Sequence, residues 1–218
     1  MAQRQRAEQG QGPEHGQGRG QGQRARKARL TARDWADAAL AAIGEGGGLA
    51  AVAVEPLAAR LGTTKGSFYW HFANREALIE AALARWVEAN TDEIIAAVET
   101  EPDPEKRLRR LFTKVTGITP VTRSATADPL ELSLLASTGH PQVAAALRQV
   151  TERRIDYLAG LFSEVGFPED EARRRGLMAY SFYLGHTQLG HAVPSALPSP
   201  EAFPGYLEAT MDALLRRE

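Results

Sequence analysis

The sequence predicts an all-α protein, and three observations lead to this fold class. Apolar residues recur every three or four positions over long stretches, which places them on one face of a helix. Pairs such as Asp103-Pro104 are typical of helix starts, and glycines such as Gly166 follow the last apolar residue of a helix. No stretch shows the strict alternation of a half-buried strand, and no internal repeat is found.

The composition predicts a soluble, cytoplasmic protein. The chain has 218 residues and is 43% hydrophobic, which is enough for one sizeable core or two small ones. It contains no cysteine, so disulfides and thiolate metal sites are excluded. No apolar run reaches the roughly 18 residues that cross a bilayer. The N-terminus also lacks the apolar stretch of a signal peptide. We therefore expect no membrane partner.

Residues 1–29 differ from the rest of the chain. They are mainly Gln, Gly and Arg, and they carry seven basic and two acidic side chains, a net charge of +5. The whole chain has a formal net charge of −1, so the remainder carries −6. A segment with almost no apolar residues cannot offset the entropy lost on ordering. We predict that residues 1–29 are a disordered basic tail.

The first helix is expected to begin just after Leu30. Thr31 is a good N-cap, Asp34 suits the positive end of the helix, and the apolar stripe continues to Ile43. Glycines at 44 and 46–48 end it. The other helices are expected at about 54–61, 64–72, from 74 to at least 95, from 104, from 129, and at 141–165, 168–192 and 201–217, with a Pro/Ser loop at 193–200.

The two short helices at 54–61 and 64–72 form a helix-turn-helix pattern. Gly62 in the turn can adopt a positive φ without strain. The residues expected to lock the two helices together are apolar: Leu57, Ala58, Leu61, Phe68 and Phe72. In such motifs the outer face of the second helix enters the major groove of DNA. Small and polar residues suit that face: Lys65, Gly66, Ser67 and Tyr69.

The stretch from Leu57 to Phe72 reads LAARLGTTKGSFYWHF, and NREAL follows at 74–78. It resembles the signature of the TetR family, because the Lys-Gly-x-x-Tyr-x-His-Phe core and the start of the next helix occur together in register. The resemblance covers about residues 31–80. Beyond this region the chain resembles the family only in its pattern of helices.

Three positions depart from the family's usual residues. Ala53 replaces the hydroxyl cap of the second helix, Pro56 is less common at its place, and Thr63 replaces an aliphatic residue. Proline is tolerated only in the first turn of a helix. We expect none of the three to abolish DNA binding, although Thr63 could alter the packing of the turn.

The resemblance implies a two-domain architecture: a three-helix DNA-binding domain at 30–76, and a C-terminal helical bundle at 77–218 for dimerisation and ligand binding. In this family two bundles pair about a two-fold axis, and the recognition helices meet successive major grooves of an operator. The function implied is a sequence-specific transcriptional regulator, most simply a repressor that a small-molecule effector releases from its operator. The implied partners are double-stranded operator DNA, the effector and a second copy of the chain.

The resemblance also implies which residues contact DNA. Lys65, Gly66 and Ser67 would approach base edges, and the other residues would contact phosphates. The full implied set is Thr31, Arg33, Thr64, Lys65, Gly66, Ser67, Tyr69, His71 and Arg75. Trp70 could equally be a packing residue, and we leave it out.

The basic tail has two interpretations once DNA is the expected partner. Residues 30–76 carry four basic and five acidic side chains, so this domain has no positive excess of its own. The tail could therefore add salt-sensitive, non-specific affinity for phosphates. Alternatively, it is a solvated leader without a role, since disordered termini are common.

The helix expected at 168–192 is apolar or small on nearly every side, so its simplest interpretation is a buried helix. The resemblance adds two functions. One face would join the helix at 201–217 in the dimer interface, and another would line a mostly apolar ligand pocket with a few polar groups. The candidate lining residues are Phe112, Leu134, Tyr157, Tyr180, Tyr183 and His186.

Two alternatives remain: an all-helical enzyme, and a DNA-binding protein that responds to no ligand. An enzyme would need converging nucleophile, acid or metal groups, and the sequence presents no such set. His186 and His191 are five residues apart and do not share a helix face. His71 has no partner at metal-ligand spacing. We predict no enzymatic activity, no cofactor and no metal.

Overall fold

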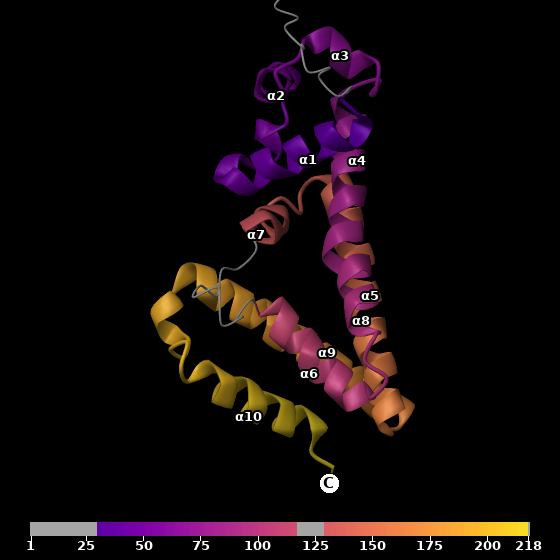
Figure 1. Cartoon of the computed structure of the whole chain (residues 1–218), viewed down its shortest axis with the longest axis vertical. Coiled ribbons are helices and arrows are strands. Elements are labelled where there is room, and N and C mark those ends of the chain that lie inside the picture. The colour runs from indigo at the N-terminus through magenta and orange to yellow at the C-terminus, as the bar shows by residue number, and fades with distance from the viewer. Residues whose placement is uncertain (1–29, 117–128, 218) are drawn as a thin grey trace, which may run out of the picture.

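A computed structural model describes residues 30–116 and 129–217, and the predicted tail at 1–29 lies outside these ranges. No strand occurs in the described part, which confirms the all-α class. Helices α1 (Ala32–Ala42) to α3 (Lys65–Tyr69) lie at one end of the molecule, and α10 (Phe203–Leu215) lies at the other (Figure 1). The long helices α4 (Arg75–Val87) and α8 (Pro141–Val165) pack side by side between the two ends.

The first helix, α1, spans Ala32–Ala42 and begins as its sequence predicts. The Thr31 hydroxyl accepts a hydrogen bond from the Asp34 amide, and the Asp34 carboxylate accepts one from the Thr31 amide at 2.7 Å. This reciprocal pair is a capping box. The glycines after α1 do not form an open loop, because a π-turn, η1 (Ile43–Gly47), and a 3₁₀ turn, η2 (Gly48–Ala51), follow directly.

The helix-turn-helix consists of α2 (Val54–Arg60) and α3 (Lys65–Tyr69). Gly62 adopts φ +62° in the turn between them, a conformation that favours glycine. Phe68 of α3 is 1% exposed and meets the Trp35 ring of α1 edge to face, with 5.4 Å between ring centroids. Burial of this ring fixes α3 against α1.

The sequence predicts one long helix from Asn74 to beyond Ile95, and the structure interrupts it. Helix α4 (Arg75–Val87), capped by the Asn74 side chain, passes into a π-turn, η3 (Glu88–Asp92), before α5 (Glu93–Val98) begins. A π-turn widens the helix locally and breaks the regular hydrogen-bond pattern. Here it lies between the bundle and the end of the molecule that carries α1 to α3, which we call the DNA-binding end after its predicted function.

The bundle follows with starts close to the predicted ones. Asp103 caps α6 (Pro104–Val115) by accepting hydrogen bonds from the amides at 105 and 106. Gly166 ends the long helix α8 with φ +107°. The remaining elements are α7 (Pro129–Leu135), α8 (Pro141–Val165), α9 (Glu169–Ala192), a 3₁₀ turn η4 (Pro194–Ala196) inside the predicted Pro/Ser loop, and α10 (Phe203–Leu215).

Two hydrophobic clusters form the core. The first joins α1 to α4 with α7 and the start of α8, and it includes Trp35, Trp86 and Leu134. The second joins α5, α6, α8, α9 and α10, and it includes Phe112 and Phe162. The first cluster therefore crosses the predicted boundary between residues 76 and 77. Within the described ranges, no helix is long and apolar enough to span a membrane.

Candidate nucleic-acid interface and ligand cavity

One face of α3 carries exposed polar and small residues over a buried aromatic base. Tyr69 is 57% exposed, and Lys65 and Gly66 are also exposed, whereas Phe68 between them is buried. Ser67 is half-buried. Phe68 therefore packs into the core, and the opposite face of α3 is exposed and accessible to a partner.

Gly66 has no packing reason to be glycine. A Cβ built there meets only the Thr64 hydroxyl at 3.6 Å, which is ordinary contact, and the residue has no positive φ. The fold would therefore accept a side chain at this position. A missing side chain on an exposed recognition face suits close approach of the helix to DNA.

Lys65 is paired in the free protein. Its ammonium lies 3.0 Å from a Glu55 carboxylate oxygen, and both side chains are more than half exposed. The hydrogen bond to Glu55 and its charge raise the pKa of Lys65 above its ordinary value. Thr64 holds the N-cap position of α3, but its hydroxyl makes no capping hydrogen bond.

Arg75, at the start of α4, forms hydrogen bonds with two backbone carbonyls that precede α2. Its Nε donates to the Val52 carbonyl at 2.7 Å, and its Nη2 donates to the Leu49 carbonyl at 2.5 Å. A further Nη1 contact reaches the Glu76 carboxylate at 3.7 Å. The guanidinium thus links the start of α4 to the turn before α2, whose carbonyls lie 23 and 26 residues away in sequence. This is a role within the fold, and the phosphate contact of Arg75 stays a prediction.

The other predicted contact residues flank α3. Arg33 is exposed on the first turn of α1 and forms no ion pair with any described residue. Thr31 is exposed, but its hydroxyl also donates to Asp34 at 2.8 Å. His71 is half-buried beside Phe72, with 6.5 Å between ring centroids. Arg33 and Thr31 belong to the start of α1 and His71 follows α3, and these two helices lie at the same end of the molecule (Figure 1).

Trp70 is a candidate contact that the sequence analysis left out. It is the C-cap residue of α3 and is 80% exposed, although large apolar side chains usually pack inside. The sequence signal that could have selected Trp70 is its position between Tyr69 and His71, two predicted DNA contacts. The sequence could not separate burial from exposure there, because the end of so short a helix has no fixed apolar face.

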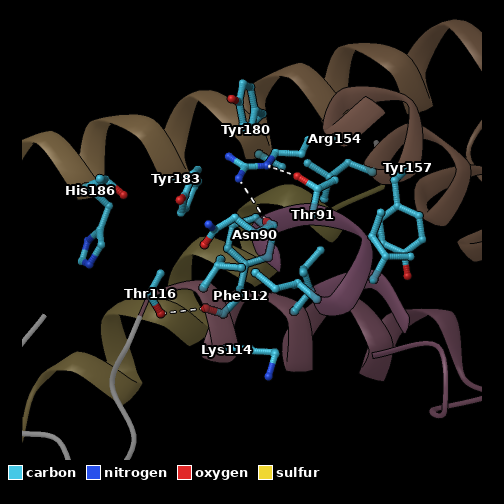
Figure 2. Close-up of a pocket in the computed structure, with 17 residues that line it drawn as sticks. Asn90, Thr91, Phe112, Lys114, Thr116, Arg154, Tyr157, Tyr180, Tyr183 and His186 are labelled. Carbon is cyan, nitrogen blue, oxygen red and sulfur yellow. Dashed lines mark hydrogen bonds between the residues drawn. The ribbon is translucent and has the colours of Figure 1, made fainter. Parts of the chain in front are cut away.

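A cavity of about 230 Å³ lies within the bundle. Its wall comes from η3, α5, α6, α8 and α9, and is mainly apolar with polar groups at several points (Figure 2). The apolar lining residues are Ile94, Ile95, Leu111, Phe112, Val115, Leu158 and Ala179, and the polar or aromatic ones are Asn90, Thr91, Lys114, Thr116, Arg154, Tyr157, Tyr180, Tyr183, His186 and Thr187.

Five of the six residues predicted for a ligand wall line this cavity: Phe112, Tyr157, Tyr180, Tyr183 and His186. Leu134 does not. It is fully buried in the first hydrophobic cluster, because α7 packs its apolar face against η1 of the DNA-binding end. Leu134 therefore supports the junction between the two ends of the molecule.

A buried network of hydrogen bonds connects two residues of the cavity wall to Glu131, which lies outside the wall. The Glu131 carboxylate of α7 is 2% exposed and accepts from Arg154 Nη1 and from the Tyr183 hydroxyl, each at 2.7 Å. Burial, together with the nearby Glu131 charge, raises the pKa of Tyr183 above its ordinary value. Burial opposes the charge of Arg154, but Glu131 favours it, and the net effect raises the pKa of the guanidinium.

Arg154 also explains the interruption of the α4–α5 helix. Its Nη2 donates to the Asn90 carbonyl at 3.1 Å, and its Nε donates to the Thr91 hydroxyl at 3.2 Å. Both partners belong to η3. Arg154 therefore joins the cavity wall to the π-turn (Figure 2) and, through Glu131, to α7. Sequence analysis did not select Glu131 or Arg154, since nothing in their spacing signals a pair 23 residues apart.

His186 lies in the cavity wall with its polar atoms unused. It is 5% exposed, and neither ring nitrogen has a hydrogen-bond partner in the part of the chain that the structure describes. Burial lowers the pKa of the imidazole. The described residues also contain no group of three or more side chains that could hold a metal ion.

Comparisons with known proteins agree with this geometry. Residues 36–82 match the family model of bacterial regulatory proteins of the tetR family. No curated protein matches the chain.

Solved structures match over most of their length. A transcriptional regulator from Rhodococcus sp. Rha1 is 21% identical, with a TM-score of 0.66 over 85% of this chain and 94% of that one. A transcriptional regulator from Saccharomonospora viridis in complex with choline is 20% identical, with a TM-score of 0.63 over 83% and 95%. A TetR-family regulator from Rhodococcus sp. is 19% identical, with a TM-score of 0.61 over 85% and 98%.

The family model matches only residues 36–82, whereas the solved structures match the fold of most of the chain. At such identities the structural matches establish the fold alone, while the family model identifies the helix-turn-helix region. The chain therefore carries the DNA-binding domain of the bacterial TetR family of regulators, within a fold that it shares with solved TetR-family transcriptional regulators.

Proposed function

We propose that this protein is a sequence-specific DNA-binding repressor that leaves its operator when a small molecule occupies the bundle cavity. The observation that carries the proposal is that α3 has a buried face and an exposed face. Phe68 is buried in the core, while Lys65 and Tyr69 are exposed at one end of the molecule. Such a helix is built to enter a major groove. The predicted division into domains at 30–76 and 77–218 belongs to this proposal.

The direct readout of bases should depend on Lys65. Lys65→Ala is expected to weaken operator binding by about 1–3 kcal/mol, the usual loss when one base contact is removed. The Lys65–Glu55 pair is exposed, so its loss should change the free energy of unfolding only slightly. A gel-retardation titration on the DNA upstream of the protein's own gene measures the effect.

Lys106→Ala is the matched control, since it removes the same charge from an exposed position on α6, far from α3. Operator affinities that fall equally in both variants would mean that Lys65 acts only through net charge. Unchanged affinity in the Lys65 variant would remove it from the interface.

Two contacts support a route from the cavity to the DNA-binding end. Arg154 lines the cavity and pairs with Glu131, whose helix α7 packs against η1. Leu130 of that helix lies 3.4 Å from the position a Cβ would take on Gly44. A ligand that favours another placement of Arg154 would therefore also favour another placement of α7 and of η3. The choline bound to the Saccharomonospora viridis regulator supports the view that this fold can hold a small molecule.

The homodimer is part of the proposal, and the structure changes the face we assign to it. The last helix, predicted to share the interface, packs largely within its own chain, because Phe203, Met211 and Leu214 are all at most 4% exposed. By contrast, Leu177 and Leu189 of α9 are 52% and 42% exposed. We therefore assign the two-fold interface to the outward face of α9.

Gly185→Arg should convert the dimer into a monomer. Gly185 is exposed on α9, and a Cβ there meets nothing within 4 Å, so the single chain tolerates the arginine. In the dimer the charged side chain would be forced into an apolar contact. Light scattering at micromolar concentration measures the mass.

Gly205→Arg on α10 is the matched control, since its Cβ position is equally open. It should stay dimeric. A monomer from the Gly205 variant alone would return the interface to α10, and a monomeric parent protein would contradict the homodimer.

A further inference from the structure

His186 is a buried polar side chain whose hydrogen bonds the folded chain does not supply. It lines the cavity, is 5% exposed, and has both Nδ1 and Nε2 unpartnered among the described residues. Leaving a buried polar group without a partner destabilises a fold, so such groups in native proteins call for an explanation. A ligand that enters the cavity and bonds to the imidazole is one such explanation.

Three aromatic rings lie around His186. Phe182, Phe203 and Tyr206 lie with centroids 6.0, 5.3 and 6.2 Å from the imidazole. The Thr187 hydroxyl, next in sequence, also belongs to the cavity wall. Burial keeps the imidazole neutral near pH 7, because it lowers the pKa. A neutral imidazole offers one donor and one acceptor, which suits a ligand hydroxyl or carbonyl.

The buried part of the wall offers no unpaired charge to a charged ligand. No carboxylate lines the cavity in the described part of the chain. Glu131 lies outside the wall, and its two oxygens already accept from Arg154 and Tyr183. Arg154 lines the cavity, but its charge is paired with that of Glu131. The other basic residue of the wall, Lys114, is exposed to solvent. A charged ligand would therefore lose its hydration without gaining a buried partner of opposite charge.

The size of the cavity bounds the ligand. A cavity of about 150 Å³ in another protein accepts benzene, and this one measures about 230 Å³. By proportion it holds a molecule of roughly ten non-hydrogen atoms. The apolar side chains on the wall, such as Ile94, Leu111 and Phe112, would cover most of such a molecule.

We infer that the cavity takes an uncharged, amphipathic molecule whose apolar body fills the bundle and whose hydroxyl or carbonyl oxygen binds His186. The inference deepens the proposed effector function and rests on it for the view that this cavity is a ligand site. His186 is then the specificity-determining residue, and the pairing of Arg154 with Glu131 leaves the buried wall without a charge that would hold a charged ligand.

Three probes with one alkyl chain test the ligand class: 1-octanol, octanoate and octyltrimethylammonium. Titration calorimetry on the full chain should give the highest affinity for 1-octanol and at least about tenfold weaker binding of the ammonium ion. Higher affinity for either charged probe would overturn the uncharged class. So would no binding of 1-octanol up to its solubility limit.

Two variants test the anchor. His186→Phe should weaken 1-octanol binding about three- to tenfold, through loss of a hydrogen bond, and should raise the melting temperature of the free protein. His191→Phe is the matched control, since it makes the same change on the exposed end of α9, outside the cavity wall. It should change neither quantity. Equal affinity of the parent and His186→Phe proteins for 1-octanol would overturn the anchor.

A DNA retardation assay with the same probes separates this inference from the proposed function. Binding of 1-octanol through His186 without release of DNA would contradict the proposed regulation and leave the ligand class standing. Release of DNA by octyltrimethylammonium, with weaker binding of 1-octanol, would support the regulation and overturn the ligand class.

Discussion

Replacing Glu131 by Ala is expected to lower the free energy of unfolding by about 3–5 kcal/mol, the cost of leaving a buried charge without its partner. Glu131 is 2% exposed and accepts from both Arg154 and Tyr183 at 2.7 Å. Its loss would strand a guanidinium whose side chain is only 13% exposed. Urea denaturation followed by circular dichroism measures the change.

The neighbouring exposed pair provides the control. Asp92 lies in η3 and pairs with Arg153 at 2.7 Å, with side chains 46% and 53% exposed. Asp92→Ala should cost under about 1 kcal/mol, because water screens exposed pairs. The double replacement of Glu131 by Leu and Arg154 by Met should recover part of the loss, since no buried charge remains. Equal losses at Glu131 and Asp92 would mean that the network does not stabilise the fold.

Replacing Phe68 by Ala is expected to destabilise the DNA-binding end by about 3–5 kcal/mol, the usual result of emptying a buried aromatic site. The ring is 1% exposed, meets Trp35 edge to face and stacks on Phe72 with 5.6 Å between centroids. Operator binding should be lost together with the helix-turn-helix. Denaturation by circular dichroism and gel retardation report the two losses separately.

Tyr69→Ala, one residue further along α3, should give the opposite pattern. Its ring is 57% exposed, so its removal should change stability by less than about 1 kcal/mol, while operator affinity falls through loss of a phosphate contact. A Phe68 variant that keeps full stability, or a Tyr69 variant as unstable as the Phe68 variant, would contradict the division of α3 into a core face and a DNA face.

The local structure of this protein follows from its sequence. The capping box at Thr31, the Asp103 cap and the left-handed Gly166 each depend on residues within a few positions of one another. The apolar spacing likewise fixed which residues of the helix-turn-helix face inward, and burial of Leu57 and Phe68 confirms that pattern. Short-range chemistry of this kind can be read without a structure.

Contacts between distant residues were decided by tertiary structure alone. Arg75 binds carbonyls 23 and 26 residues away, and Arg154 reaches Asn90 over a separation of 64 residues. The same long-range packing placed Leu134 outside the cavity. No spacing rule encodes such pairs, because a side chain's partner is fixed only when separate helices meet. For this protein the sequence determined where most helices begin and which residues form the helix-turn-helix, whereas the packing of α7, α8 and η3 determined which polar side chains join the cavity wall to α7 and to η3.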